Sequence, residues 1–158
     1  MSKIKVADFY YGAVLSMLFH NNIKPALVEG NDDRQVYDLT TNNTEFRLFI
    51  KYRTDKQNII TKDYNSWVFI LSENDRKEIL YYLDSGYNLI IALACGVKGL
   101  IDSELAMLDK HEIKQIIDLQ KGSITISRRK NERSFRISIG GGRNSSIQIK
   151  ANRFTELS

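Results

Sequence analysis

The stretch Glu45-Phe46-Arg47-Leu48-Phe49-Ile50-Lys51-Tyr52-Arg53 is the clearest structural signal in the sequence. Apolar residues alternate along it with charged ones, and only Phe49 interrupts the charged series. Successive side chains of a β-strand point to opposite faces, so this pattern predicts a half-buried antiparallel strand over 45–53.

The spacing of apolar residues and the positions of turn-forming residues predict the other helices and strands. The mostly apolar segment 7–20 is expected to form a helix that is embedded on more than one side. Further strands are expected over 26–28, 35–41, 66–72, 89–94 and 105–108, with 66–72 in the interior of a sheet. Helices should begin at Ser72 or Asn74 and at the Asp109-x-x-Glu112 capping box, and three tail strands should span 123–127, 135–139 and 147–150.

This order of elements lacks the regular strand–helix alternation of a doubly wound fold. We therefore expect an α+β fold with a largely antiparallel or mixed sheet, packed by an N-terminal helix and two further helices. A length of 158 residues suits one core, so the expected organisation is a single domain, 1–158. Within it, 1–120 forms the α+β body and 121–158 forms a basic C-terminal β-subdomain.

Features of the chain also indicate its compartment. The single cysteine, Cys95, lies in an apolar run, where it can form no intrachain disulfide. The uncharged stretch 9–19 is too short to span a membrane and lacks a cleavage pattern. We expect a cytoplasmic protein with no membrane partner.

Charge is distributed unevenly along the chain. The net charge is +4, but residues 121–158 contain nine Lys and Arg against two Asp and Glu, while residues 1–120 contain 14 against 17. A basic segment of this kind attracts phosphate backbones or acidic protein surfaces. It can equally serve to keep an exposed hairpin soluble and to protect its edge from pairing.

The alternation of side chains along the tail strands predicts that their polar residues lie together on one face of a sheet. One parity of its strands is apolar and should face inward, while the other carries Arg136, Gln148 and Lys150 with several serines. Cations and hydroxyl groups on a rigid sheet suit a phosphate backbone. We expect a small non-catalytic domain that uses no cofactor and binds nucleic acid or an acidic protein. The expected contact residues are Arg128, Arg129, Lys130, Arg133, Arg136, Arg143 and Lys150.

Two residues of the central hairpin suggest an enzyme as the alternative. Asp38 on one expected strand and Lys51 on the next, after a leading helix, resemble the metal-dependent nuclease core written PD-(D/E)XK. The resemblance implies catalysis by Asp38 and Lys51 with Mg²⁺. The sequence departs from it at Phe49, where the family has a carboxylate, and Mg²⁺ normally takes more than one protein carboxylate. A degenerate or rearranged nuclease and a simple cross-strand ion pair of Asp38 both remain open.

A third class is a protein-binding adaptor or inhibitor. Aromatic residues are numerous, and adjacent helical tyrosines such as Tyr81 and Tyr82 cannot both face a core. Exposed tyrosines are enriched at protein interfaces. Neither His20 nor His111 has a neighbour at metal-ligand spacing, so no metal site is expected.

Overall fold

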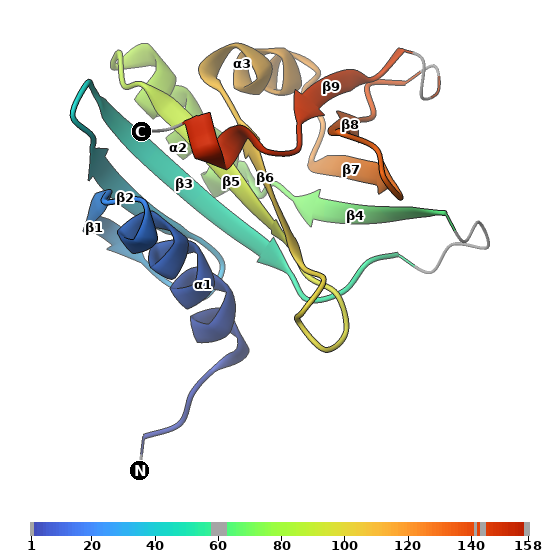
Figure 1. Ribbon diagram of the computed structural model, residues 1–158. Coiled ribbons are helices and arrows are strands. Elements are labelled where there is room, and N and C mark those ends of the chain that lie inside the picture. Colours follow the sequence, from blue (N-terminus) through green and yellow to red (C-terminus); the bar gives the residue numbers. More distant parts are fainter. Residues whose placement is uncertain (1, 58–62, 141, 143–144, 157–158) are drawn as a thin grey trace.

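The computed structural model describes residues 2–57, 63–140, 142 and 145–156 (Figure 1). Within them the chain forms three α-helices and two sheets, which confirms the α+β class. The elements in chain order are α1 (Val6–His20), β1 (Lys24–Gly30), β2 (Gln35–Thr40), β3 (Glu45–Arg53), β4 (Tyr64–Ile70), α2 (Glu73–Asp84), β5 (Leu89–Cys95), β6 (Glu104–Leu108), α3 (Lys110–Asp118), β7 (Ser123–Arg129), β8 (Ser134–Ile137), β9 (Ile147–Lys150) and a short 3₁₀ helix, η2 (Arg153–Glu156).

The larger sheet, sheet 1, has the strand order β1-β2-β3-β5-β6 and is mixed. β3 lies at its centre, antiparallel to β2 and parallel to β5. The predicted bounds 45–53 and the antiparallel pairing are confirmed on the β2 side, but the strand also has a parallel neighbour, β5, and is buried on both faces at its middle rather than half-buried. The middle of the charged parity is also covered. Arg47 packs against Tyr82 of α2 and pairs with Asp38, and Lys51 pairs with Asp75 of α2, whereas Glu45 and Arg53 at the strand ends are exposed.

The smaller sheet, sheet 2, is antiparallel and has the order β4-β7-β8-β9. The basic tail thus shares its sheet with β4, a strand from the expected body. β4 lies at the edge of sheet 2 rather than in a sheet interior as expected. Its residues Trp67 and Phe69 are fully buried, but Ile70 on the other face is 60% exposed.

Two apolar clusters hold these layers together. On one face of sheet 1, α1 and Phe154 of η2 pack on side chains such as Leu48 and Ile50. On the other face, side chains such as Phe49 and Ile91 pack with α2, α3 and the inner face of sheet 2. The second cluster joins the two sheets, so sheet 2 is supported from behind along its length.

The helix starts follow from capping chemistry. The Ser72 hydroxyl accepts a hydrogen bond from the backbone N–H of Asp75, and the Asp75 carboxylate accepts one from the backbone N–H of Ser72, each at 3.0 Å. Asp109 and Glu112 form the same reciprocal arrangement at the start of α3. Both expected helix starts are confirmed, and Ser72 rather than Asn74 is the cap of α2.

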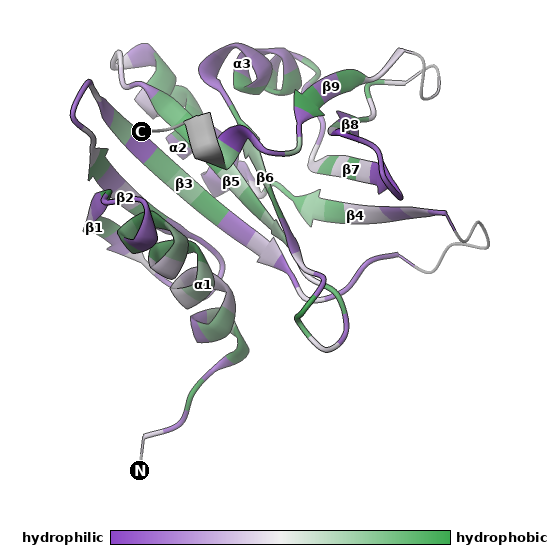
Figure 2. Ribbon diagram, in the orientation of Figure 1, coloured by the Kyte–Doolittle hydropathy of each residue, from purple (hydrophilic) through white to green (hydrophobic). Residues whose placement is uncertain are grey.

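Helix α1 differs from the expectation in its burial. The prediction that 7–20 is embedded on more than one side is wrong for the described chain. Ala7, Tyr10, Tyr11, Val14 and Leu18 pack on sheet 1, and the opposite side of the helix is exposed. Figure 2 shows that α1 is mostly green and pale along its length, so its apolar character is not confined to the buried face. Among the described residues, no helix is long and apolar enough to cross a membrane.

Candidate nucleic-acid interface

The outward face of sheet 2 is polar over β7, β8 and β9, while on β4 it also carries Val68 and Ile70. The apolar parity of the tail strands faces inward as predicted, with Ile124, Ile126, Phe135, Ile137 and Ile149 buried and Ile139 and Ile147 partly buried. The other parity forms rows across the sheet, because paired residues share a face. One row crosses all four strands and consists of Ser66, Ser127, Arg136 and Gln148. Beside it, Tyr64 lies opposite Arg129, and Ser134 lies opposite Lys150.

Three of the predicted cations lie on the turn between β7 and β8. Arg129, Lys130 and Arg133 are all exposed. The turn is fixed by the backbone: the N–H of Lys130 donates to the carbonyl of Asp63 at 2.7 Å, and Asn131 takes the left-handed conformation, with φ +67°. Asn tolerates this conformation better than most residues. The three charges are therefore displayed from a defined turn at one end of sheet 2.

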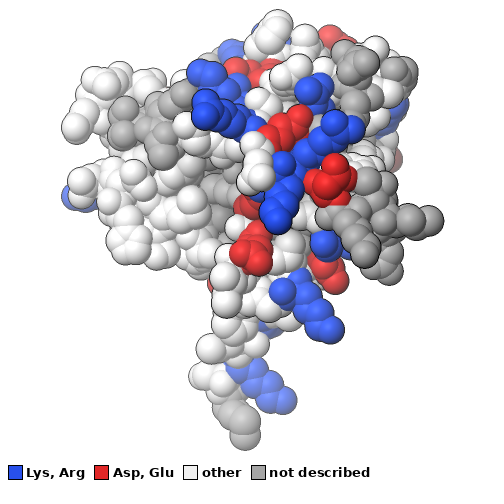
Figure 3. Space-filling model, turned by 45° about the vertical axis from the view of Figure 1, so that its right-hand side comes forward, with Lys and Arg blue, Asp and Glu red and all other residues white. Residues whose placement is uncertain are grey.

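Two other predicted contact residues, Arg128 and Arg136, have structural partners. The Arg128 guanidinium forms an ion pair with Glu104 and donates to the carbonyl of Glu132 at 2.8 Å. Arg136 forms an ion pair with the Glu132 carboxylate at 3.0 Å. Both arginines are half-buried, and they tie the hairpin to β6 and to its own turn. Figure 3 shows acidic side chains among the basic ones on this side of the molecule, so the local positive charge is smaller than the sequence count suggests.

A pocket lies between the start of β8 and the end of β9. Its volume is about 610 Å³, and Arg133, Ser134, Lys150, Ala151 and Asn152 line it. The N–H of Ala151 donates to the carbonyl of Arg133 at 2.9 Å, which keeps the two strand ends together. Two cations, a hydroxyl and an amide thus share one pocket, which is the set of groups that binds a phosphate. The seventh predicted contact residue, Arg143, lies outside the described residues.

The structure does not bring Asp38 and Lys51 together. Asp38 lies directly opposite Arg47 and accepts two hydrogen bonds from its guanidinium, at 2.9 and 3.0 Å. Lys51 lies four residues further along β3, or ~13 Å at the usual rise of a strand. The residue opposite Phe49 is Val36, and both are fully buried. Asp38 thus forms a cross-strand ion pair, one of the two alternatives that the sequence left open, with Arg47 as its partner, and it is not placed beside Lys51.

Arg47 is also held by aromatic rings. Its guanidinium carbon lies 3.9 Å from the ring centroid of Tyr87 and 4.8 Å from that of Tyr82. The hydrogen bond from Arg47 to Asp38 raises the pKa of the guanidinium, against the opposing effect of burial. Tyr87 therefore covers an ion pair, whereas Tyr81 is 64% exposed, which confirms that Tyr81 and Tyr82 do not both face the core.

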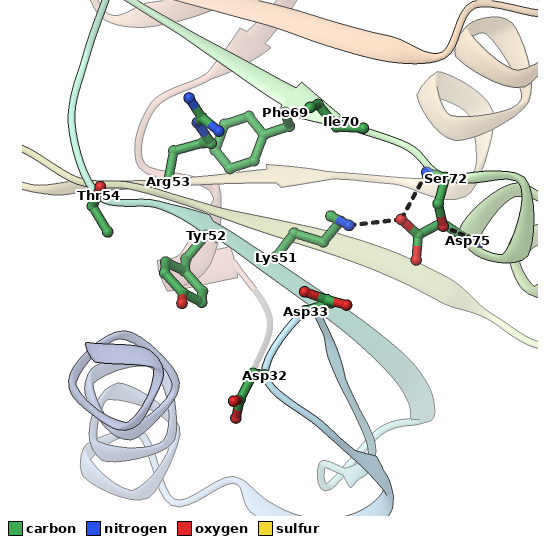
Figure 4. Close-up of a pocket in the computed structure, with 10 residues that line it drawn as sticks. All are labelled: Asp32, Asp33, Lys51, Tyr52, Arg53, Thr54, Phe69, Ile70, Ser72 and Asp75. Atoms are coloured by element: carbon green, nitrogen blue, oxygen red, sulfur yellow. Dashed lines mark hydrogen bonds and ion pairs between the residues drawn. The ribbon is translucent and has the colours of Figure 1, made fainter. Parts of the chain in front are cut away.

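Lys51 instead belongs to a charge network that the sequence did not reveal. Its Nζ lies 2.6 Å from Oδ2 of Asp75, whose side chain is 2% exposed, and Arg34 donates to Oδ1 of Asp75 at 2.6 Å. Burial raises the pKa of Asp75, but the hydrogen bonds from Lys51, Arg34 and the Ser72 N–H outweigh it and lower that pKa. Figure 4 shows Lys51 and Asp75 on the wall of a pocket of about 490 Å³, with Asp32 and Asp33 on the opposite loop.

Arg34 links this network to a pair of carboxyl groups. Its Nη2 lies 3.1 Å from Oε1 of Glu29 and 2.5 Å from Oε2 of Glu78. The hydrogen bond from Glu78 lowers the pKa of Glu29, whereas burial and the same hydrogen bond raise the pKa of Glu78. Glu78 therefore keeps its proton to higher pH than an isolated glutamate, and Glu29 loses its proton at lower pH. The Tyr82 hydroxyl donates to Oε1 of Glu78 at 2.5 Å.

The charged side chains of this network pair with one another, so their carboxylates are already engaged by Lys51 and Arg34. The described part of the chain contains no group of three or more His, Cys, Asp or Glu side chains arranged to hold a metal ion. Cys95 is buried, and burial raises the pKa of its thiol. Asp75 could have been noticed as a capping residue, but nothing in the sequence pairs it with Lys51 or Arg34, which lie 24 and 41 residues away.

Comparison with known proteins gives no relative for this arrangement. No protein-family model, no curated protein and no solved structure matches the chain significantly. The outward face of sheet 2, with the β7–β8 turn and the pocket beside β9, therefore stands as a candidate interface on its geometry alone.

Proposed function

We propose that this chain binds nucleic acid through a basic face, defined here as Arg129, Lys130, Arg133, Arg136 and Lys150. The observation that carries the proposal is that Arg129, Arg136 and Lys150 lie on the outward side of sheet 2, with Lys130 and Arg133 on the adjoining β7–β8 turn. Four of them, Arg129, Lys130, Arg133 and Lys150, are exposed. Two of those four share a pocket with the Ser134 hydroxyl.

The chemistry of the basic face favours contact with the phosphate backbone over recognition of bases. Sequence is read mainly by side chains that enter a groove, most often from a helix or a two-stranded ribbon. The outward side of sheet 2 carries short hydroxyl and amide side chains together with Val68 and Ile70 of β4. Its described part has one aromatic ring, Tyr64, beside Arg129. We therefore expect binding that depends strongly on salt and weakly on sequence.

The rigidity of the face supports the proposal. Arg128 and Arg136 are held by Glu104 and Glu132, and the inner side of sheet 2 packs on the main core. Charges fixed by the fold lose less conformational freedom on binding than charges on a flexible tail. A nucleic acid strand would thus meet a surface that is already arranged.

A substitution experiment tests the proposal. Arg129, Lys130 and Arg133 are changed together to Ala, and binding of labelled 20-nucleotide single strands and 20-base-pair duplexes of DNA and RNA is followed by fluorescence anisotropy. We expect affinity to fall at least ~10-fold and to a similar extent for unrelated sequences. The matched control removes three exposed lysines elsewhere, Lys24, Lys77 and Lys98, and should bind like the wild type.

Two results would overturn the proposal. One is equal binding by the wild type and the triple variant. The other is no binding to any of these nucleic acids at 50 mM salt, which would leave an acidic protein as the partner of the basic face.

A further inference from the structure

The outer side of α1 is apolar and lies uncovered in the described structure. Between Val6 and His20 the helix has a single carboxylate, Asp8, and no Lys or Arg. Phe9 is 51% exposed and Phe19 is 59% exposed, and Val6 and Met17 are also exposed. A helix that is apolar on all sides is normally buried on all sides. One side of α1 is therefore exposed to solvent although its side chains are mostly apolar.

The apolar surface extends onto the neighbouring edge strand. On β1, which borders sheet 1, Leu27 is 64% exposed and Val28 is 43% exposed. Leu27 is paired with Tyr37, a residue of the cluster that packs under α1, so it lies on the same side of the sheet as the helix. We call this surface the α1 face; it consists of Val6, Phe9, Met17, Phe19 and Leu27, while Val28 lies in the bulge that follows Leu27.

The size of the α1 face matches a protein interface. A buried aromatic side chain covers ~150–250 Å², so these five partly exposed side chains together offer roughly 450 Å² of apolar surface. Stable interfaces bury about 800 Å² on each partner, of which about 65% is apolar in homodimers. An apolar patch of this size equals the largest patch on a typical monomer, and such patches are often functional.

We propose that the α1 face is the contact between two copies of this chain, with the two α1 helices antiparallel. The small residues Gly12, Ala13 and Ser16 occupy the middle of the exposed side, and a Cβ added to Gly12 would meet no atom within 4 Å. Two helices can therefore approach closely there. A two-fold axis at this point brings the Phe9 end of each helix to the Phe19 end of the other.

Charge complementarity favours this arrangement. Lys3 and Lys5 precede α1 and are exposed, and the antiparallel pairing places them near the C-terminal end of the other helix. Lys5 also forms an exposed ion pair with Asp32 at 3.4 Å, and pairs of this kind contribute little to stability and exchange readily. That end carries the negative pole of the helix dipole, which attracts cations. The α1 face has no charge pattern of its own that would select a different, charged partner. Because α1 lies away from β7, β8 and β9 (Figure 1), such a dimer would leave both copies of the basic face accessible.

Light scattering after size-exclusion chromatography, at loading concentrations from 1 to 100 μM, tests the pairing. We expect the wild type to be a dimer at high concentration and Phe9→Glu to be a monomer. Ile101→Glu places the same charge at a fully accessible site outside the face, where residue 101 is 93% exposed, and should remain a dimer.

A second variant guards against a folding defect in Phe9→Glu. Ser16→Cys puts a thiol at the middle of the contact, while the native Cys95 is buried. Mild oxidation should cross-link Ser16→Cys into dimers, and the same change at the exposed Ser85 should not cross-link. A monomeric wild type at 100 μM would overturn the proposal. A dimer that persists in folded Phe9→Glu, with no cross-link at position 16, would also overturn it.

Discussion

The Nζ atom of Lys51 lies 2.6 Å from Oδ2 of Asp75, and this contact joins the centre of sheet 1 to the first turn of α2. The same Asp75 carboxylate accepts a hydrogen bond from Ser72 N–H and one from Arg34. The single buried carboxylate of Asp75 therefore caps the N-terminus of α2 and neutralises two cations, Lys51 and Arg34. The stability of the α2–sheet 1 contact should depend on it.

Asp75→Ala tests this dependence. Removing one partner of a buried ion pair costs about 3–5 kcal/mol, because the remaining charges are left buried without compensation. We expect a loss of that size in the free energy of unfolding, measured by urea denaturation. Glu73→Ala, in the same helical turn but exposed, should cost less than ~0.5 kcal/mol. A loss below ~1 kcal/mol for Asp75→Ala would contradict the role assigned to this carboxylate.

The Glu29–Glu78 pair predicts a pH dependence of stability. The pKa of Glu78 is raised from its ordinary value of 4.5, so the folded state keeps the proton at pH values where the unfolded chain loses it. Its contribution to the free energy of unfolding is thus complete below pH ~4.5 and is lost as the pH rises through the folded-state pKa. The lowered pKa of Glu29 acts in the opposite sense, because its contribution is lost as the pH falls.

Glu78→Gln separates the two carboxyl groups, since Gln cannot ionise. Relative to the wild type, the variant should gain stability as the pH rises from ~4 to ~7. Urea denaturation at several pH values measures the difference. A difference that does not change with pH would show that Glu78 has the same pKa in the folded and unfolded chains.

Asp38→Ala addresses the resemblance to metal-dependent nucleases. Asp38 is about half exposed and holds Arg47, so its loss should cost only ~1 kcal/mol. We expect no cleavage of DNA or RNA by the wild type with Mg²⁺ or Mn²⁺, because Asp38 is paired with Arg47 and Val36 faces Phe49 where a carboxylate would be needed. Cleavage by the wild type that Asp38→Ala abolishes would refute this interpretation.

Gly96→Ala tests the packing between β5 and the end of β3. A Cβ at this position would lie 2.3 Å from the carbonyl oxygen of Arg53 and 2.5 Å from the hydroxyl of Tyr10. We expect a loss of about 3 kcal/mol from overpacking. Trp67, the single tryptophan, is buried and donates to the Gly96 carbonyl at 2.7 Å, so its fluorescence reports unfolding. Gly122→Ala, with no heavy atom within 4 Å, should change stability by less than ~0.5 kcal/mol.

The sequence predicts those parts of the fold that depend on local pattern. Alternation gives the bounds of β3, capping residues give the starts of α2 and α3, and strand parity gives the inward side chains of β7 to β9. Pairing between distant segments has no such signal. Nothing local shows that β4 joins β7, or that β3 runs parallel to β5.

The candidate site shows the same division. Parity correctly placed Arg136, Gln148 and Lys150 on the outward side of sheet 2. Strand parity cannot show that Arg128 forms an ion pair with Glu104, 24 residues earlier in the chain. That contact exists only once β6 and β7 lie close together in the fold. The basic face is consequently smaller than the nine cations of the tail suggested.

The salt dependence of nucleic-acid binding tests the central claim most directly. The logarithm of the association constant falls with the logarithm of salt concentration by about 0.9 per phosphate contact for duplex DNA and about 0.7 for single strands. With Arg129, Lys130, Arg133 and Lys150 in contact, we expect a slope of about −3 to −4 on duplex for the wild type. For the triple variant Arg129→Ala, Lys130→Ala and Arg133→Ala we expect about −1. A slope near zero for the wild type, or an equal slope for both proteins, would contradict the claim that the basic face binds nucleic acid.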